Sequence, residues 1–493
     1  MGMLSRARRV FPLIVSLIVL QTAAPATTPA ESDRAVCGTT VGVASPPSGA
    51  VTVDPGTDLS ALTRTSPAGT TFWLSPGTHK LASDQFGQVI PKDGDVYLGA
   101  PGAVLDGQRI NQAAFTQQAA DVVIRGLTIR GFVAPLNQGV VNHDSGPRWV
   151  VEDNIIEDNE GAAMMAGIGQ VVRGNCLRNN GQYGINAYRS SGGLTDLVIE
   201  DNEITGNNTG DWETRVPGCG CTGGAKFWSV DGADIRDNWV HHNHGAGIWA
   251  DTNNNDFVVE GNLIEDNANE GLFYELSYNL SLSGNTFRRN ALPYGQRRAE
   301  KGDNFPVAAV YISESGGEPR LAARTNLIDI RGNYFTDNWS GITLWENADR
   351  FCNSPANTSS LSCTPVAPAV ASCAQPGIAT APLFDDCRWK TQRVLVRENT
   401  FEFDSETPGC RSLCGRMAVL SNYGTYPDWS PYKAWTVPEA ITFHQGNQWS
   451  DNQYYGPWTF VAHDASRTLS IAAWQAAPYN QDTCSTFDGS PGC

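Results

Sequence analysis

Residues 197–207 read L-V-I-E-D-N-E-I-T-G-N, and the pattern returns as A-D-I-R-D-N-W-V-H-H-N at residues 233–243 and as F-V-V-E-G-N-L-I-E-D-N at residues 257–267. Each segment has an asparagine at its sixth position and another at its eleventh. An aliphatic residue stands three positions before the first asparagine, and another stands two positions after it. A unit that recurs with fixed internal spacing indicates a repeat protein, in which each unit stacks on its neighbours.

Two columns of asparagines extend this pattern over most of the chain. The first column is Asn154, Asn175, Asn202, Asn238, Asn262, Asn285, Asn333, Asn399 and Asn447. The second is Asn159, Asn180, Asn207, Asn243, Asn267, Asn290, Asn338 and Asn452, with Asp404 as the one departure. In a solenoid whose strands stack at ~4.8 Å, each inward amide lies over the amide of the next coil and bonds to it. We therefore interpret these asparagines as architecture and not as catalytic residues.

The residues around the asparagines agree with this interpretation. The aliphatic positions predict inward-facing side chains, because they keep their spacing to the asparagine in every repeat. Two positions before the first asparagine, the charge alternates from one repeat to the next in the series Glu152, Arg173, Glu200, Arg236 and Glu260. Stacked in one column, these side chains would form a solvated ladder of ion pairs on the outside of the solenoid.

These repeats resemble the right-handed parallel β-helix of the pectin-lyase-like superfamily, over roughly Val96 to Phe487. The resemblance implies an all-β fold, a single-stranded solenoid of about ten to twelve coils with loop insertions. We assign residues 96–493 to the β-helix and residues 31–95 to a lead-in and cap, in which Asp58 to Arg64 has the pattern of a short helix. The superfamily contains polysaccharide lyases, glycoside hydrolases, epimerases and surface-binding proteins. The resemblance therefore implies a polysaccharide-active protein and leaves the reaction open.

Residues 1–30 have the composition of a secretion signal peptide. Arg6, Arg8 and Arg9 precede an apolar stretch from Val10 to Leu20 that is too short to span a bilayer. We expect a secreted, extracellular protein without membrane insertion. The formal net charge of −17 argues against nucleic acid or anionic lipid as the main partner. The expected partner is a polysaccharide or oligosaccharide, and the sequence does not distinguish a monomer from a homotrimer.

The twelve cysteines gather mainly in loops. Cys219 lies beside Cys221, and Cys410 lies near Cys414. A longer loop holds Cys352, Cys363, Cys373 and Cys387, and Cys484 and Cys493 close the chain. In an exported chain, this clustering predicts disulfides that staple the loop insertions. A zinc site is the alternative, although the spacings lack paired C-x-x-C knuckles.

The candidate site lies on an outward face of the coils. Aligning the glycine-led strand of each repeat places Asn186, Lys226, Trp249, Phe273 and Tyr311 in one outward column. A second column holds Tyr188, Trp228, Asp251, Glu275 and Trp345, and Arg189, Glu314 and Glu346 follow at the turn. Insertions at residues 207–223, 291–306, 347–391 and 423–440 would form walls beside this face. Exposed aromatic rings suit stacking against sugars; the alternative is that the insertions fold over them as a secondary core.

Asp251 and Glu275 stand in one column on consecutive coils, so their carboxyl groups should lie about 5 Å apart. Two carboxyls that close push one pKa upward, which gives an acid and a base near neutral pH. Hydrolysis of a glycosidic bond needs such a pair, with one group protonating the leaving oxygen and the other attacking or activating water. The alternatives are a cation site or a hydrogen-bonded ladder, and the stereochemistry stays open.

Three functions remain open from the sequence. The first is a glycoside hydrolase with Asp251 and Glu275 as the catalytic pair and with Lys226 orienting the substrate. The second is a polysaccharide lyase in which calcium is bound by Asp251, Glu275, Glu314 and Glu346, with Lys226 or Arg189 as base or clamp. The third is a non-catalytic glycan-binding module. No cofactor is expected except calcium in the lyase.

Overall fold

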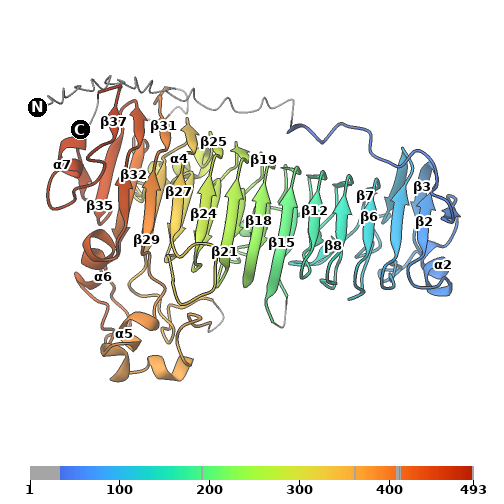
Figure 1. The fold of residues 1–493 in the computed structure, drawn as a ribbon, viewed down its shortest axis with the longest axis horizontal. Coiled ribbons are helices and arrows are strands. Elements are labelled where there is room, and N and C mark those ends of the chain that lie inside the picture. The colour runs from blue at the N-terminus through green and yellow to red at the C-terminus, as the bar shows by residue number, and fades with distance from the viewer. Residues whose placement is uncertain (1–33, 190–191, 360–361, 407–409, 411, 491–493) are drawn as a thin grey trace, which may run out of the picture.

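The computed structural model of the chain describes residues 34–189, 192–359, 362–406, 410 and 412–490. The predicted signal peptide, residues 1–30, lies outside the described residues. From Val51 onward the chain coils into a long parallel β-helix with three sheets along its length (Figure 1). This architecture confirms the predicted fold class.

The first and second sheets contain thirteen strands each, and the third contains eleven. The strands of the first sheet are β1 (Val51–Val53), β2 (Thr71–Leu74), β4 (Val96–Gly99), β6 (Val123–Arg125), β9 (Val150–Glu152), β12 (Val171–Arg173), β15 (Leu194–Glu200), β18 (Val230–Arg236), β21 (Asn255–Glu260), β24 (Leu280–Ser283), β27 (Ile328–Arg331), β30 (Val394–Arg397) and β33 (Gln448–Ser450). Those of the second sheet are β3 (Gly77–Lys80), β5 (Ala103–Asp106), β7 (Thr128–Arg130), β10 (Ile155–Glu157), β13 (Cys176–Arg178), β16 (Glu203–Thr205), β19 (Trp239–His241), β22 (Leu263–Glu265), β25 (Thr286–Arg288), β28 (Tyr334–Thr336), β31 (Thr400–Glu402), β34 (Gln453–Tyr455) and β37 (Thr486–Phe487).

The third sheet carries the candidate site. Its strands are β8 (Gly139–Val141), β11 (Ala162–Met165), β14 (Ile185–Ala187), β17 (Ala225–Phe227), β20 (Ile248–Ala250), β23 (Leu272–Glu275), β26 (Val310–Ser313), β29 (Ile342–Glu346), β32 (Arg416–Ser421), β35 (Thr459–His463) and β36 (Thr468–Leu469). The parallel stack already begins inside the predicted lead-in, because β1, β2 and β3 precede residue 96. The thirteen strands of the first sheet correspond to thirteen coils, one more than the upper limit of the predicted ten to twelve.

Helices are short and lie at the ends or in insertions. Among the described residues they are α2 (Leu59–Thr65), α3 (Trp212–Arg215), α4 (Leu292–Glu300), α5 (Leu383–Asp386), α6 (Thr436–Glu439) and α7 (Ile471–Gln475), with the 3-10 turns η1 (Val370–Cys373) and η2 (Gly377–Ala379) and the π-helical turn η3 (Ala440–His444). The expected capping helix is α2: the Asp58 side chain accepts a hydrogen bond from the Ala61 amide at 2.9 Å, and Leu59 is buried at the end of the core.

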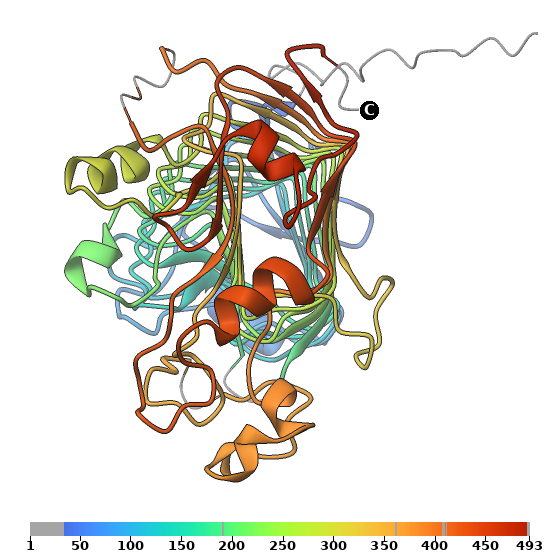
Figure 2. The ribbon, with the colours of Figure 1, turned by 90° about the vertical axis from the view of Figure 1, so that its left-hand side faces the viewer.

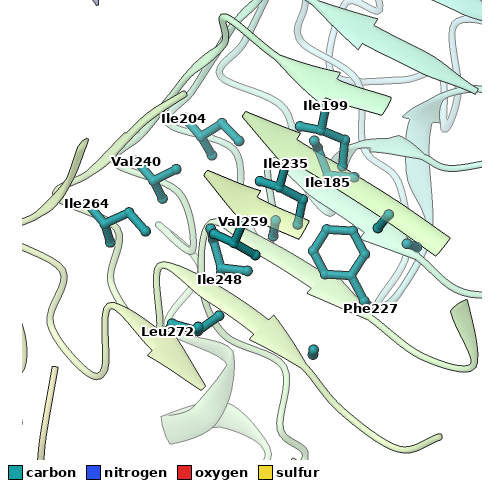
Figure 3. Packing of buried hydrophobic residues seen from close by; sticks show 14 of the residues in the cluster. Ile185, Ile199, Ile204, Phe227, Ile235, Val240, Ile248, Val259, Ile264 and Leu272 are labelled. Carbon is teal, nitrogen blue, oxygen red and sulfur yellow. The ribbon is translucent and has the colours of Figure 1, made fainter. Parts of the chain in front are cut away.

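Aliphatic side chains from all three sheets fill the inside of the coils. Side chains at the same repeat position stack in rows, as Figure 3 shows for Ile199, Ile235 and Val259 of the first sheet and Ile204, Val240 and Ile264 of the second. Each of them is at most 2% exposed. Full burial of such a side chain contributes about 1.5–3 kcal/mol, so the core of every coil depends on the coils on both sides.

The asparagines form two continuous hydrogen-bond ladders. Asn175 Nδ2 donates to Asn202 Oδ1 at 3.0 Å, and the Asn202 amide donates to Asn238 Oδ1 at 3.0 Å. The first ladder runs without interruption from Asn154 to Asn452. The ladders confirm that these residues are architectural.

One assignment in the ladder is corrected by the structure. Asn452 follows Asn399 in the first ladder, with Asn399 Nδ2 donating to Asn452 Oδ1 at 3.1 Å. We predicted Asn447 at that place and Asn452 in the second column. Because Asn447 precedes Asn452 by the same five residues that separate the two columns, the spacing alone fits both alignments. The pairing of Val396 with Trp449 shows which alignment the strands adopt.

The outer charged column forms the predicted ion ladder. Arg173 lies 2.8 Å from Glu152 on one neighbouring coil and 3.3 Å from Glu200 on the other. Arg236 continues the column by pairing with Glu260. These pairs are partly exposed to solvent, so each contributes little to stability.

The segment before β1 forms a strap along the outside of the solenoid. The amide of Val43 donates to Gly99 O at 2.7 Å, at the level of β4. At its other end, the amides of Val36 and Cys37 donate to Glu203 Oε2 at 2.7 and 2.6 Å, at the level of β16. A disulfide from Cys37 to Cys176 fixes the strap to β13.

Four further disulfides staple loops, as predicted: Cys219–Cys221, Cys352–Cys363, Cys373–Cys387 and Cys410–Cys414. Cys493, the expected neighbour of Cys484, lies outside the described residues. Among the residues described, no helix combines the length and apolar character needed to cross a membrane.

Candidate active site

A cleft of about 780 Å³ lies on the outward face of the third sheet. Its floor consists of residues from successive coils: Lys226, Trp228, Trp249, Asp251, Phe273, Glu275, Tyr311 and Trp345. Eight of the twelve predicted site residues therefore line one cleft. They meet because β17, β20, β23, β26 and β29 pair in parallel, which sets Lys226 beside Trp249, Trp249 beside Phe273 and Phe273 beside Tyr311.

Insertions between the strands form the walls of the cleft. Insertion 207–223 contributes Cys219 and Gly220, insertion 291–306 contributes Arg298 and Phe305, and insertion 347–391 contributes Ser359. Seen along the solenoid, α3 and α4 of the first two insertions project from one side and α5 of the third projects from an adjacent side (Figure 2). The fourth predicted wall, 423–440, contributes no described lining residue.

The aromatic rings of the floor stack on one another. The Phe273 ring lies between those of Trp249 and Tyr311, with centroids 5.0 and 4.8 Å apart. Lys226 Nζ covers the Trp249 ring, 4.0 Å from its centroid. The ring faces of Trp249 and Phe273 are therefore occupied within the protein, and these residues can offer only their edges to a ligand. Trp228, whose aromatic neighbour Tyr188 meets it edge-on, keeps its character as a stacking surface.

Asp251 is held in place by the Lys226 ammonium. Lys226 Nζ lies 3.0 Å from Asp251 Oδ2 and donates to Gly220 O at 2.6 Å, and Asp251 Oδ1 accepts from the amide and hydroxyl of Thr252 at 2.7 and 2.9 Å. Burial disfavours the charged ammonium, but Tyr183 and Asp251 outweigh it, so the pKa of Lys226 is raised. A raised pKa is the opposite of what a lysine needs to act as a base.

Glu275 lies on the coil after Asp251 and is 8% exposed. Trp249 Nε1 donates to its Oε2 at 3.1 Å, and Arg350 Nη1 lies 2.6 Å from its Oε1. Burial raises the pKa of Glu275, the Arg350 guanidinium opposes this rise, and the Asp251 carboxylate adds to it. The sequence therefore predicted correctly that neighbouring carboxyls influence each other. It did not reveal Arg350, which comes from insertion 347–391.

Glu270 is a third carboxyl group of the cleft and was missed in the sequence. It lies two residues before β23, where the neighbouring coils have the buried residues Ala246 and Gly223. Burial raises the pKa of Glu270 to about 7, and Glu275 adds to the rise. The signal in the sequence was a glutamate at a position where other coils have a small residue.

Glu314 and Glu346 do not line the cleft, which corrects their prediction as substrate-binding residues. Each is only 1% exposed and lies under an arginine from insertion 347–391. Arg350 Nε is 3.4 Å from Glu314 Oε1, and Arg388 pairs with Glu346. The pKa of Glu314 rises to about 7 because it is buried. The ion pairs of both glutamates tie the wall to the strands beneath it.

A side cleft of about 570 Å³ adjoins the first one and contains the remaining predicted residues, Tyr188 and Arg189. Lys226, Trp228 and Cys219 line both clefts. Tyr188 is 41% exposed. The two clefts therefore form one groove along the third sheet, from β14 to β29.

The residues predicted to hold calcium do not fit that ion. Asp251 is paired with Lys226, Glu275 with Arg350, and Glu346 with Arg388, so their oxygens already neutralise cations. Calcium prefers several free oxygen ligands. Outside the cleft, the sulfurs of Cys352, Cys363 and Cys373 lie within 4.8 Å of one another, but they belong to two disulfides.

Comparisons with known proteins agree with this fold. A sequence profile described as "right handed beta helix region" matches residues 96–215 and 196–320. Comparison with curated proteins gives no match. The catalytic unit of a GH87 alpha-1,3-glucanase from Streptomyces thermodiastaticus strain HF3-3 is similar at 15% identity, with 86% of this chain and 69% of that chain covered and a TM-score of 0.47.

Two further solved structures are similar to the chain. The A-module of a mannuronan C-5 epimerase from Azotobacter vinelandii matches at 12% identity, with 83% of this chain and 96% of that chain covered and a TM-score of 0.42. The pectate lyase Pel9A matches at 12% identity, with 58% and 71% covered and a TM-score of 0.37. At these values the likenesses carry no argument about the reaction. The profile match and the stacked parallel strands together show that the chain is a right-handed parallel β-helix.

Proposed function

We propose that this protein is a secreted glycoside hydrolase that cleaves an extracellular polysaccharide. One observation carries the proposal: a lysine-paired carboxylate, Asp251, and a carboxyl with a raised pKa, Glu275, lie on adjacent coils at the floor of an aromatic-lined cleft. Hydrolysis of a glycosidic bond needs two carboxyl groups that differ in this way, because one acts as a proton donor and the other acts as a carboxylate.

The two carboxyl groups have separate tasks in this proposal. Glu275, whose pKa is raised by burial, is the group that donates a proton to the leaving oxygen, and Arg350 and Trp249 Nε1 stabilise the carboxylate that remains. Asp251, held by Lys226 and Thr252, is the nucleophile or the base that activates water. Trp228 binds a sugar ring beside the pair, and Lys226 fixes Asp251 more than it orients the substrate. Glu270, with a pKa raised to about 7, faces the same cleft.

The charge of the cleft favours an uncharged glycan over a uronate. Lys226 and Arg350 are each paired with a carboxylate of the site, and Arg298 is paired with Asp303. An acidic polysaccharide would have to compete with these carboxylates for the cations. The lyase alternative also needs a base with a lowered pKa, whereas that of Lys226 is raised. The disulfide staples support an extracellular location, since such bonds persist in oxidising compartments.

The test uses the full chain and a panel of neutral and acidic polysaccharides, read by new reducing ends and by the absorbance of unsaturated uronates. We expect new reducing ends without that absorbance. Asp251→Asn and Glu275→Gln should each lower the rate about 10²–10⁴-fold and keep glycan binding. Glu260→Gln, on the exposed ladder, is the matched control. Absorbance that disappears with a chelator would establish a lyase, and binding without cleavage would establish a binding module.

A further inference from the structure

We propose that the groove is closed at its Trp345 end, so that the enzyme acts on chain ends and releases a short, fixed product. This inference rests on the proposed hydrolase function and concerns how the chain enters the cleft. In this proposal the groove has two halves. The half around Tyr188 binds a long glycan chain, and the half beyond Glu275 binds only a short segment of that chain.

The open half begins at the pair and runs toward the N-terminal coils. The two clefts share Lys226, Trp228 and Cys219, so a chain bound over Trp228 continues directly into the side cleft. Tyr188 lies at the far end of this path and is 41% exposed. Arg189 and Ser229 line the same side cleft and provide hydrogen-bonding groups for sugar hydroxyls. The proposal places the long part of the glycan chain on this side of the pair.

The closed half is blocked by the end of insertion 291–306. The Phe305 ring packs edge-on against both Tyr311 and Trp345, with centroids 5.6 and 5.3 Å apart. Behind this contact, Asn304 Nδ2 donates to Ala465 O at 3.1 Å, and Arg416 Nη1 donates to Asn304 O at 3.0 Å. The segment is thus tied across two further coils, β32 and the turn after β35.

Trp345, on the sheet side of Phe305, forms the other part of the wall that closes the groove. It packs against a small apolar cluster formed by Ala418, Leu420, Val461 and Ala465 on the coils beyond it. The Thr343 hydroxyl also donates to Pro306 O at 2.5 Å, which fastens the segment to the sheet at the same level. No residue of β32 or β35 lines either cleft among the residues described.

The length of the closed half predicts the product. Glu275 lies on β23, and the blocking Phe305 ring contacts Tyr311 on β26 and Trp345 on β29, so the wall lies one to two strand spacings of ~4.8 Å further along the third sheet. One spacing is close to the length of one pyranose residue along a glycan chain. The space between the acid and the wall therefore holds about one or two sugar units, and we expect a monosaccharide or a disaccharide as the product.

The experiment is a time course on the polysaccharide that the panel shows to be cleaved, with products separated by length. The structure predicts one short product from the earliest time points, while the remaining polymer shortens slowly. An early ladder of many lengths would overturn the inference and leave the hydrolase proposal intact. Absence of cleavage on the whole panel overturns the proposed function itself, so the two failures are distinguishable.

Two variants test whether the wall sets the product length. Phe305→Ala removes the blocking ring, and Asn304→Ala removes the bond to Ala465. Each should add longer oligosaccharides to the products. Phe86→Ala is the matched control, because Phe86 is 62% exposed near the N-terminal cap, and it should leave the product unchanged. If both wall variants fold, cleave and still release only the original product, the wall does not limit the chain.

Discussion

Replacing Glu270 with glutamine should make the protein more stable at alkaline pH and leave its stability unchanged at acid pH. The pKa of Glu270 is about 7 in the folded chain, against an ordinary value of 4.5, because the group is buried beside Glu275. Between these two values the folded state binds a proton that the unfolded state has lost. The free energy of unfolding therefore falls as pH rises from 4.5 to 7. Glutamine carries no charge, so the free energy of unfolding of the variant does not fall in this way as the pH rises.

The size of the effect follows from the two pKa values. A rise from 4.5 to about 7 corresponds to about 3 kcal/mol, at about 1.4 kcal/mol per pKa unit. We expect Glu270→Gln to match the wild type at pH 4 and to exceed it by about 3 kcal/mol at pH 8.5.

The assay is a urea titration of both proteins at these two pH values, with Glu260→Gln as an exposed control that changes neither. Equal stability of variant and wild type at pH 8.5 would refute the reasoning, because the carboxyl would then not be destabilised in the fold. A variant that is less stable at both pH values would show that Glu270 makes a structural contact that glutamine cannot replace.

Three further predictions concern the site and the ladder. Gly220→Ala should lower kcat/KM at least about tenfold. The backbone of Gly220 has φ +60°, and a Cβ there would lie 2.8 Å from the Trp249 ring. Circular dichroism should show an intact fold. Asn243→Ala should cost about 1–3 kcal/mol in urea unfolding, because Asn207 loses the buried Asn243 Oδ1 as its acceptor and Asn267 Oδ1 loses the Asn243 Nδ2 donor. Arg350→Met should raise the pKa of Glu275 further, so the alkaline limb of the pH–rate profile should move to higher pH; an unmoved limb would remove Glu275 as the acid.

The fold was predictable because its signals are local and repeat. An asparagine such as Asn202 is recognisable from its own repeat, and the next coil supplies the same information again. The column that contains Trp249, Phe273 and Tyr311 was also predictable, since parallel pairing preserves the order of outward positions. What the repeats do not encode is which face of a ring remains free, because that depends on neighbours such as Lys226.

The residues that the sequence did not reveal lie in insertions or at positions that break the repeat. Arg350 and Phe305 reach the cleft from loops whose path has no periodic pattern, so their contacts with Glu275 and Trp345 follow only from the folded chain. The burial of Glu314 under Arg350 has the same cause. The error at Asn447 has a different cause. Its spacing to Asn452 equals the spacing between the two asparagine columns, so the local pattern fits a register that the strands do not adopt.

The strap along the first coils changes how the solenoid can come apart. A stack of repeats with nearest-neighbour contacts can fray from either end, one coil at a time. The strap bonds to Gly99 and to Glu203, and the Cys37–Cys176 disulfide joins it covalently to a coil between them. The N-terminal coils therefore cannot peel away singly, and this end of the molecule opens as one block. The strap therefore protects the end that a protease would otherwise unwind first.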